Sequence, residues 1–296
     1  MADKDGMKNP KDYHLDVPFR GGQIMNEVRG IRGLDWGMQK RMSNIFNPAT
    51  GKTVMLAFDH GYFMGSTSGL ERLDLLVPRL MDKVDVLMGT RGAFRTCVPS
   101  TADCGVALRV SSGSSVLNED LSHEVVAVDI ADAIRLDADA MAVQVFIGAE
   151  GQKQSIENLS KVINAGLNYG IPTLGVVAVG KQMERTPKYF KLATRMIAEL
   201  GAHIVKTYYC ENMEEIVAAC PVPIVIAGGK KIPERDALEM VYRGIQSGAA
   251  GVDMGRNVFQ AENPEAMAEA VARIVHQGED SAHAYEFYLD ALGGNR

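Results

Sequence analysis

Short apolar segments alternate with longer amphipathic segments from about residue 52 onward. Eight apolar runs are rich in Val, Ile and Ala, which is typical of parallel strands that are buried on both faces. These runs cover residues 54–59, 84–89, 105–110, 140–147, 173–179, 202–208, 222–228 and 250–255. Between them, residues 154–170, 187–201 and 233–248 have apolar side chains at helical spacing, and each segment ends in glycine.

Repeated alternation of strand and helix predicts parallel strands joined by right-handed crossovers. Eight such units close into a (β/α)8 TIM barrel, so we predict an α/β fold of this type with an N-terminal extension. The alternative is an open doubly wound sheet, which usually has a G-x-G-x-x-G turn after its first strand, and the sequence has none there. The expected organisation is an arm and short helix over 1–50, the barrel over 51–278 and a C-terminal tail over 279–296.

The N-terminal extension contains one amphipathic pattern. Residues 34–46 place Leu34, Met38, Met42 and Ile45 at helical spacing, which predicts a short helix. This helix could close the bottom of the barrel or lie against another subunit. Residues 1–33 have no sustained period and are expected to form an arm or loop.

Composition narrows the function classes. The 296 residues have a formal net charge of -6, which argues against a nucleic-acid partner. No run approaches the length of a membrane span, and the N-terminus lacks the apolar core of a signal peptide, so we expect a cytoplasmic protein. No C-x-x-C pair is present, and reduced thiols are expected at Cys97, Cys104, Cys210 and Cys220.

Lys206 is the most informative single residue, because it interrupts the apolar run HIVKTYY where a buried strand should carry Val or Ile. A lysine inside a barrel is costly to desolvate and tends to lose its proton. The neutral amine is a nucleophile toward carbonyls, which predicts Schiff-base catalysis. The alternative is a structural lysine that is paired with a carboxylate.

Two loops have the composition of a phosphate site. GGKK follows the seventh apolar run and MGRN the eighth, so that glycine and a cation come together after each strand. Glycine lets backbone N–H groups approach a phosphate, and the loops after strands seven and eight are the usual phosphate site of barrels. The predicted phosphate-binding residues are Gly228, Gly229, Lys230, Gly255 and Arg256. Tight turns with solvated charges are the alternative.

Other polar residues near the strand ends allow more than one interpretation. Asp59 ends the first run and could relay protons during Schiff-base chemistry, or it could orient a cation. His60 is either structural or catalytic, and Cys210 is either an acyl-carrying nucleophile or a buried thiol. The six histidines are scattered and form no metal-ligand motif, so we predict no catalytic metal and no bound cofactor.

These motifs also carry a family resemblance. DWGMQKRMSNIFNPATGKTVMLAFDHGYF, VKTYY, PVPIVIAGGKK and GVDMGRNVFQ resemble the archaeal-type class I fructose-bisphosphate aldolases from about residue 34 to near the end. The resemblance is strongest to thiolase members of autoinducer-2 degradation. It implies a Schiff base at Lys206, a strand-one acid at Asp59 and phosphate loops at the positions above. It also implies a five-carbon phosphorylated dione as substrate, coenzyme A as co-substrate, and a ring-like homo-oligomer such as a decamer.

One departure from the family pattern affects the expected reaction. The aldolases of this family use a tyrosine near the end of strand four as acid–base catalyst, and the local pattern VQVFIG places Phe146 there. The missing hydroxyl counts against a fructose-bisphosphate aldolase or a related Schiff-base synthase. A catalytically inactive barrel that serves as a scaffold is the other alternative, and Lys206, Asp59 and the two phosphate loops count against it.

Overall fold

The structure, a computed structural model, describes residues 16, 28–65, 67–180 and 183–293. Eight parallel strands form a closed barrel in which each strand pairs with its neighbours in chain order. They are β1 (Thr53–Ala57), β2 (Val86–Thr90), β3 (Gly105–Arg109), β6 (Ala140–Val145), β7 (Thr173–Val177), β8 (Ile204–Tyr208), β9 (Ile224–Ala227) and β10 (Gly251–Met254). All eight predicted strands and the (β/α)8 fold are therefore confirmed.

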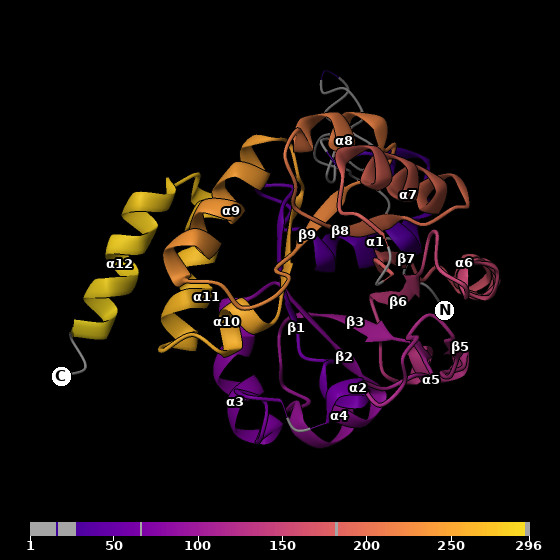
Figure 1. Cartoon of the computed structure of the whole chain (residues 1–296), viewed down its shortest axis with the longest axis horizontal. Coiled ribbons are helices and arrows are strands. Elements are labelled where there is room, and N and C mark those ends of the chain that lie inside the picture. The colour runs from indigo at the N-terminus through magenta and orange to yellow at the C-terminus, as the bar shows by residue number, and fades with distance from the viewer. Residues whose placement is uncertain (1–15, 17–27, 66, 181–182, 294–296) are drawn as a thin grey trace, which may run out of the picture.

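Helices surround the barrel (Figure 1). The three predicted helices are present as α6 (Gln152–Tyr169), α7 (Pro187–Glu199) and α9 (Glu234–Gln246). Between the other strands lie α2 (Gly61–Met64), α3 (Leu73–Leu80), α4 (Arg91–Cys97), α5 (Ile130–Arg135) and α8 (Met213–Ala219). After β10 come α10 (Arg256–Phe259), α11 (Pro264–Ala272) and a π-helical turn, Arg273–Gln277.

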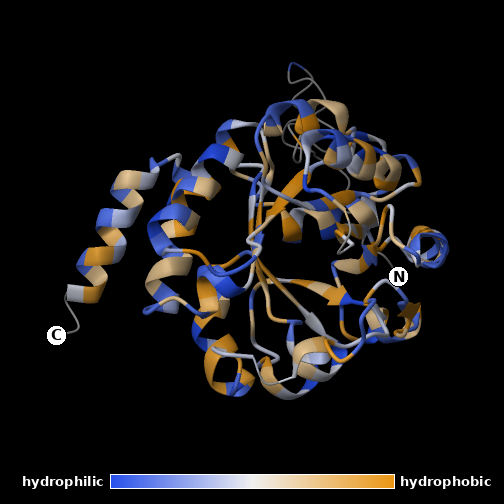
Figure 2. Ribbon diagram, viewed as in Figure 1, coloured by the Kyte–Doolittle hydropathy of each residue, from blue (hydrophilic) through white to orange (hydrophobic). Residues whose placement is uncertain are grey.

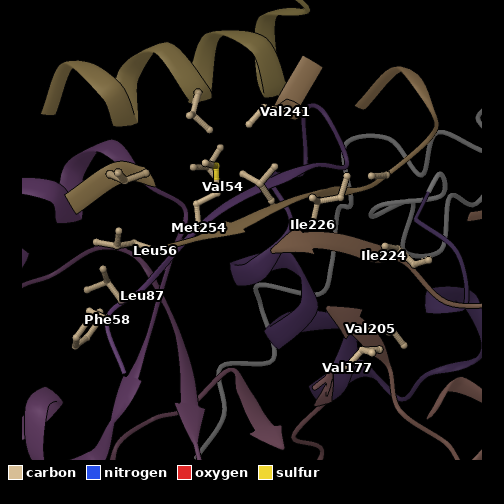
Figure 3. Close-up of a cluster of buried hydrophobic side chains, with 14 of the residues drawn as sticks. Val54, Leu56, Phe58, Leu87, Val177, Val205, Ile224, Ile226, Val241 and Met254 are labelled. Atoms are coloured by element: carbon tan, nitrogen blue, oxygen red, sulfur yellow. The ribbon is translucent and has the colours of Figure 1, made fainter. Parts of the chain in front are cut away.

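Alternation along the strands divides the buried side chains into two layers. Side chains of one parity, such as Val54, Leu56, Val205 and Ile226, point outward and pack against the helices (Figure 3). Side chains of the other parity fill the barrel interior, and this layer includes Met55, Met88, Ala142, Ile204 and Val225. The central strands are accordingly hydrophobic, whereas the surrounding helices alternate between polar and apolar positions (Figure 2).

The N-terminal end of the barrel is closed by helix α1 (Trp36–Ile45), within the segment that the pattern of residues 34–46 predicted. Its Met42 and Ile45 belong to the same buried cluster as the inward side chains of the strands. Of the two predicted positions for this helix, the structure therefore shows the one beneath the barrel. Most of the predicted arm, 1–15 and 17–27, lies outside the described residues.

Neither the two short strands after β3 nor the C-terminal helix was predicted from the sequence. A short antiparallel pair, β4 (Ser111–Ser112) with β5 (Val125–Val126), follows β3 at the C-terminal end of the barrel. The predicted tail contains helix α12 (Ser281–Gly293), which lies along α9 and α11 at the outside of the molecule (Figure 1). In the described part of the chain, no helix combines the length and the apolar character that a membrane span requires.

Candidate active site

A cavity of about 320 Å³ lies at the C-terminal ends of the barrel strands. This is the end at which barrel enzymes place their catalytic groups. Most of the residues singled out in the sequence line it: Asp59, His60, Lys206, Gly228, Gly229, Gly255 and Arg256. The fold thus brings together side chains that are separated by up to about two hundred positions in the chain.

Lys206 points into this cavity from the middle of β8, because its neighbours Val205 and Thr207 take the outward positions. Its side chain is mostly buried, and Nζ lies 3.6 Å from Met88 Sδ and 2.8 Å from Asp253 Oδ2. Lys206 therefore combines the features of both earlier interpretations. It faces the cavity as a nucleophile must, and it also has a carboxylate partner.

Asp59 is held at the end of β1 by a buried arginine. Arg109 Nη1 donates a hydrogen bond of 2.8 Å to Asp59 Oδ2. Burial alone would raise the pKa of Asp59, but the nearby charges of Arg109, His60 and Lys206 outweigh it and lower the pKa. Asp59 is consequently an ionised carboxylate, which can accept a proton and can stabilise positive charge at Lys206.

Arg109 has a second buried carboxylate partner, Glu124, which precedes β5. Arg109 Nη2 donates to Glu124 Oε1 at 2.7 Å, and Ser111 Oγ donates to Glu124 Oε2 at 2.6 Å. Tyr62 Oη also donates to Glu124 Oε1, at 2.6 Å, and burial raises the pKa of this phenol. The β4–β5 pair and Tyr62 thus supply the groups that hold Arg109 in place next to Asp59.

Both predicted phosphate loops border the cavity. Gly229 has φ 70°, a left-handed conformation that favours glycine. A Cβ on Gly255 would lie 2.5 Å from His60 Cε1 and 2.7 Å from the Ala57 carbonyl oxygen, so only glycine fits. Asn257 joins the two loops, because its Nδ2 donates to the Gly228 oxygen at 2.6 Å and its Oδ1 accepts from the Ile232 N–H at 2.9 Å.

The cations of the two loops have different positions. Arg256 lines the cavity, and its buried Nε has no hydrogen-bond partner among the described residues. Lys230 is exposed and does not line the cavity. Arg256 is therefore the side chain that can neutralise an anion bound there, and the role of Lys230 stays a prediction.

His60 lines the cavity next to Asp59, with its ring edge against Phe259. Burial lowers its pKa to about 4, although the Asp59 charge acts in the opposite direction. Its Nδ1 has no hydrogen-bond partner in the described part of the structure. The ring is thus neutral near physiological pH, and it shapes the wall of the cavity without adding charge.

Two further positions from the sequence lie outside the cavity lining. Phe146 is buried, and the residue of β6 that lines the cavity is Gln144. Cys210 does not line the cavity, and burial raises the pKa of its thiol, with Glu211 and Glu214 adding to the effect. The structure therefore favours the interpretation of Cys210 as a non-catalytic thiol over a role as nucleophile.

Five residues of the site were not assigned a role from the sequence: Tyr62, Arg109, Glu124, Asp253 and Asn257. Arg109 had a usable signal, since a charged residue ends an apolar strand. Asp253 had the same signal as Lys206, because it interrupts the apolar run AGVDMG. Glu124 lies in an irregular segment and Tyr62 in the four-residue helix α2, and only the folded chain shows that they meet Arg109.

Known proteins that resemble this chain in sequence or in structure include aldolases and a thiolase. A sequence profile of the DeoC/LacD family aldolases matches residues 53–261. An uncharacterized aldolase of Pasteurella multocida is 55% identical over 98% of this chain and 99% of its own length. The 3-hydroxy-5-phosphonooxypentane-2,4-dione thiolase of Photorhabdus laumondii is 54% identical over 98% of this chain and 99% of its own. An archaeal fructose 1,6-bisphosphate aldolase superimposes with a TM-score of 0.74 and 25% identity, covering 81% of this chain and 100% of that one.

Proposed function

The chain belongs to the DeoC/LacD family of aldolases, and on this basis we propose that it is a Schiff-base thiolase. Its substrates are 3-hydroxy-5-phosphonooxypentane-2,4-dione and coenzyme A, and its products are acetyl-CoA and dihydroxyacetone phosphate. The likeness over nearly the full chain to a relative that carries this thiolase name supports the substrate. The observation that carries the chemistry is Lys206, a buried amine in a cavity bordered by two glycine loops and by Arg256, whose Nε has no hydrogen-bond partner among the described residues.

The geometry suggests how the dione binds. Its phosphate lies between the loops at Gly228–Gly229 and Gly255, where glycine allows a close approach to the backbone and Arg256 lines the cavity. The C4 ketone is adjacent to the phosphate-bearing carbon and comes close to Lys206 Nζ. The acetyl end then extends away from the phosphate loops toward coenzyme A.

The reaction requires a group that accepts the electron pair of the C2–C3 bond as this bond breaks. Lys206 condenses with the C4 ketone and forms an iminium. The thiolate of coenzyme A adds to the C2 ketone, and as the resulting tetrahedral intermediate collapses, the electron pair of the C2–C3 bond moves into the iminium. Acetyl-CoA leaves, and the enamine is protonated at C3 and hydrolysed to dihydroxyacetone phosphate. A protonated imine accepts this electron pair far better than a ketone does, which is why an amine is required.

The buried charges around Lys206 support these steps. Asp59 is ionised and close enough to Lys206 for their charges to interact, so it stabilises the iminium and can accept protons. Arg109 keeps Asp59 fixed at a hydrogen-bond distance of 2.8 Å.

The proposed enzyme works in the cytoplasm with coenzyme A and without a bound cofactor. Coenzyme A acts as a co-substrate, and neither a resident cofactor nor a metal takes part. We expect a cytoplasmic homo-oligomer, for which the free thiols of Cys97, Cys104, Cys210 and Cys220 are suitable. Analytical ultracentrifugation would give the number of subunits.

One experiment tests the function directly. Purified protein with the phosphorylated dione and coenzyme A should form acetyl-CoA, measured by liquid chromatography and mass spectrometry. Borohydride treatment with dihydroxyacetone phosphate should add the mass of the reduced ligand to the Lys206 peptide. Lys206→Ala should abolish both, and Lys206→Arg should too, because a guanidinium stays protonated. Labelling at Lys230 or Lys231 in place of Lys206 would show that the Schiff-base assignment is wrong.

A further inference from the structure

Asp253 lies on β10 beside the proposed Schiff-base lysine, and nothing above gives it a function. We propose that Asp253 is the catalytic proton acceptor of Lys206: its carboxylate takes one proton from the ammonium, which frees the amine, and returns it when water leaves the carbinolamine. This inference rests on the proposed Schiff-base function of Lys206.

The geometry is that of a dedicated pair. Asp253 Oδ2 lies 2.8 Å from Lys206 Nζ, within reach for direct proton transfer. Asp253 is 1% exposed and lines the cavity. No other group in the described residues donates a hydrogen bond to its carboxylate. A buried structural carboxylate normally has its oxygens satisfied by several donors, whereas this one depends on Lys206 alone.

The strand residues that pair with Asp253 and Lys206 offer the proton no other acceptor. On the neighbouring strands, Asp253 pairs with Met55 and Ala227, which do not titrate. Lys206 pairs with Val176 and Val225 on its own neighbours. Across the cavity, Asp59 interacts electrostatically with both members of the pair, and His60 interacts with Lys206. Arg109 and Arg256 act on His60, and Arg109 also acts on Asp59.

Asp59 and His60 are poorer proton acceptors than Asp253. Asp59 is committed to Arg109, and the pKa of His60 is lowered by burial to about 4. Burial raises the pKa of Asp253, and the Lys206 charge only partly offsets this. A protonated Asp253 beside a neutral amine is therefore more accessible than a protonated Asp59 beside Arg109.

The step balances without any added reactant. The ammonium transfers one proton to Asp253, and the nitrogen lone pair forms the C–N bond as the carbonyl electron pair moves to oxygen. A proton then passes from nitrogen to that oxygen, which gives the neutral carbinolamine. Asp253 donates its proton to the hydroxyl, water leaves, and the nitrogen lone pair forms the C=N bond. The three ammonium hydrogens end as one on the iminium and two in water, and the iminium is again paired with the Asp253 carboxylate.

The test uses the pH dependence of imine formation. The full-length protein is incubated with dihydroxyacetone phosphate and cyanoborohydride from mildly acidic to alkaline pH, and the adduct on the Lys206 peptide is followed by mass spectrometry. Asp253→Asn keeps the shape of the side chain but removes the acceptor. Trapping should slow by about 10²–10⁴-fold at neutral pH. The deficit should shrink as pH rises, because hydroxide takes over the deprotonation.

Asp139→Asn is the matched control. Asp139 is also buried, and burial likewise raises its pKa, but it bonds to Asn44 and the Val106 N–H outside the cavity. Its variant should keep the wild-type pH profile of trapping. Should Asp253→Asn fail to fold, Asp253→Ser is measured and interpreted in the same way.

Two results would overturn the role of Asp253. Trapping that is unchanged or faster at neutral pH would mean that the carboxylate only holds the lysine in its charged form. A loss by the same factor at every pH would mean that it only positions the side chain. Absence of any Lys206 adduct in the unmodified protein would instead refute the proposed function itself.

Discussion

Buried charges near Lys206 are stable only in combination, because water cannot solvate them there. The cations Lys206 and Arg109 face three carboxylates, Asp59, Glu124 and Asp253, at contact distances of 2.7 to 2.8 Å. Removing one partner leaves the other uncompensated, so each substitution here changes both chemistry and stability. The predictions for single residues therefore require a measurement of folding beside each measurement of rate.

Asp59→Asn removes one of the two carboxylates that pair with Arg109. We expect turnover to fall by about 10²–10⁴-fold, since the ionised group next to the iminium is lost. The protein should still fold, because Glu124 keeps its 2.7 Å contact with the guanidinium. Steady-state kinetics and a thermal melt check the two expectations. An unfolded variant would show that Asp59 is a structural residue.

Arg256→Ala should weaken substrate binding and leave the chemical step largely intact. The loss should be about 1.5–3 kcal/mol, as for a hydrogen bond to a charged group, and it should appear mainly in KM. Arg235→Ala is the control, because Arg235 is exposed and does not line the cavity. Equal activity of the unmodified protein on a dione without phosphate would contradict this assignment.

Removing Lys206 should make stability depend on pH through Asp253. Burial raises the folded-state pKa of Asp253 above its ordinary value. A raised folded pKa gives stability that is present at low pH and lost as pH rises through that pKa. Lys206→Ala should therefore lose stability toward neutral pH in urea titrations. The double variant Lys206→Ala with Asp253→Asn should lack this loss, and an identical pH dependence in both would contradict the coupling.

The residues found from the sequence share one property, which is that they break a local pattern. Lys206 interrupts an apolar strand, and Arg256 follows a glycine directly after one. Asp253 breaks the same pattern in the eighth predicted strand, residues 250–255, although no role was predicted for it. Glu124 breaks no pattern, and its role depends on a contact with Arg109 that is made in the folded chain.

At the scale of elements, the inward and outward parity of the strands decides which side chains reach the cavity. Both Lys206 and Asp253 occupy inward positions on strands whose outward residues pack against helices. Below them, α1 closes the barrel with Met42 and Ile45. The site is consequently supported from beneath by apolar packing.

Met42→Ala should destabilise the barrel from this lower end. Met42 is 1% exposed, and a buried Met→Ala change costs about 2–5 kcal/mol. Trp36→Ala on the same helix is the control, because Trp36 is 77% exposed and should change stability by roughly 0.5 kcal/mol or less. Urea unfolding measures both, and KM should be unchanged in each. Equal losses would mean that α1 does not support the barrel through Met42.

The sequence predicted the eight barrel strands and three long helices, and it missed the short strands β4 and β5 as well as the longer helix α12. Strands with continuous apolar runs and helices with a regular apolar face carry many residues of signal each. The strands β4 and β5 have two residues each, Ser111–Ser112 and Val125–Val126, which is too short for any periodicity. The hairpin that holds Glu124 could therefore be recognised only in the structure.

At the scale of the whole molecule, the closed barrel brings the ends of distant strands to one cavity. Lys206 from β8, Asp253 from β10 and Asp59 after β1 converge there, with Arg256 after β10 at the rim. The catalytic groups thus come from separate strands and the phosphate loops from adjacent ones. Whether such a site catalyses thiolysis or aldol cleavage then depends on which proton-transfer groups the cavity contains.

The last prediction separates thiolysis from aldol cleavage. An aldolase must deprotonate a substrate hydroxyl as the C–C bond breaks, and the resemblance implies a tyrosine for this on strand four. Here Phe146 has no hydroxyl, and the residue of β6 that lines the cavity, Gln144, does not titrate. Tyr62 lines the cavity, but burial raises its pKa and its hydroxyl donates to Glu124. Thiolysis has no such hydroxyl to deprotonate, because the acyl carbon leaves as a thioester.

We therefore expect coenzyme A-dependent formation of acetyl-CoA from the dione, and cleavage of fructose 1,6-bisphosphate that is slower by about 10²–10⁴-fold. Acetyl-CoA and triose phosphates are measured in parallel, with and without coenzyme A. Lys206→Ala is the control and should remove both activities, since both need the iminium. Brisk aldol cleavage without coenzyme A would make the protein an aldolase, and it would leave the roles of Lys206 and the phosphate loops unchanged because both reactions share them.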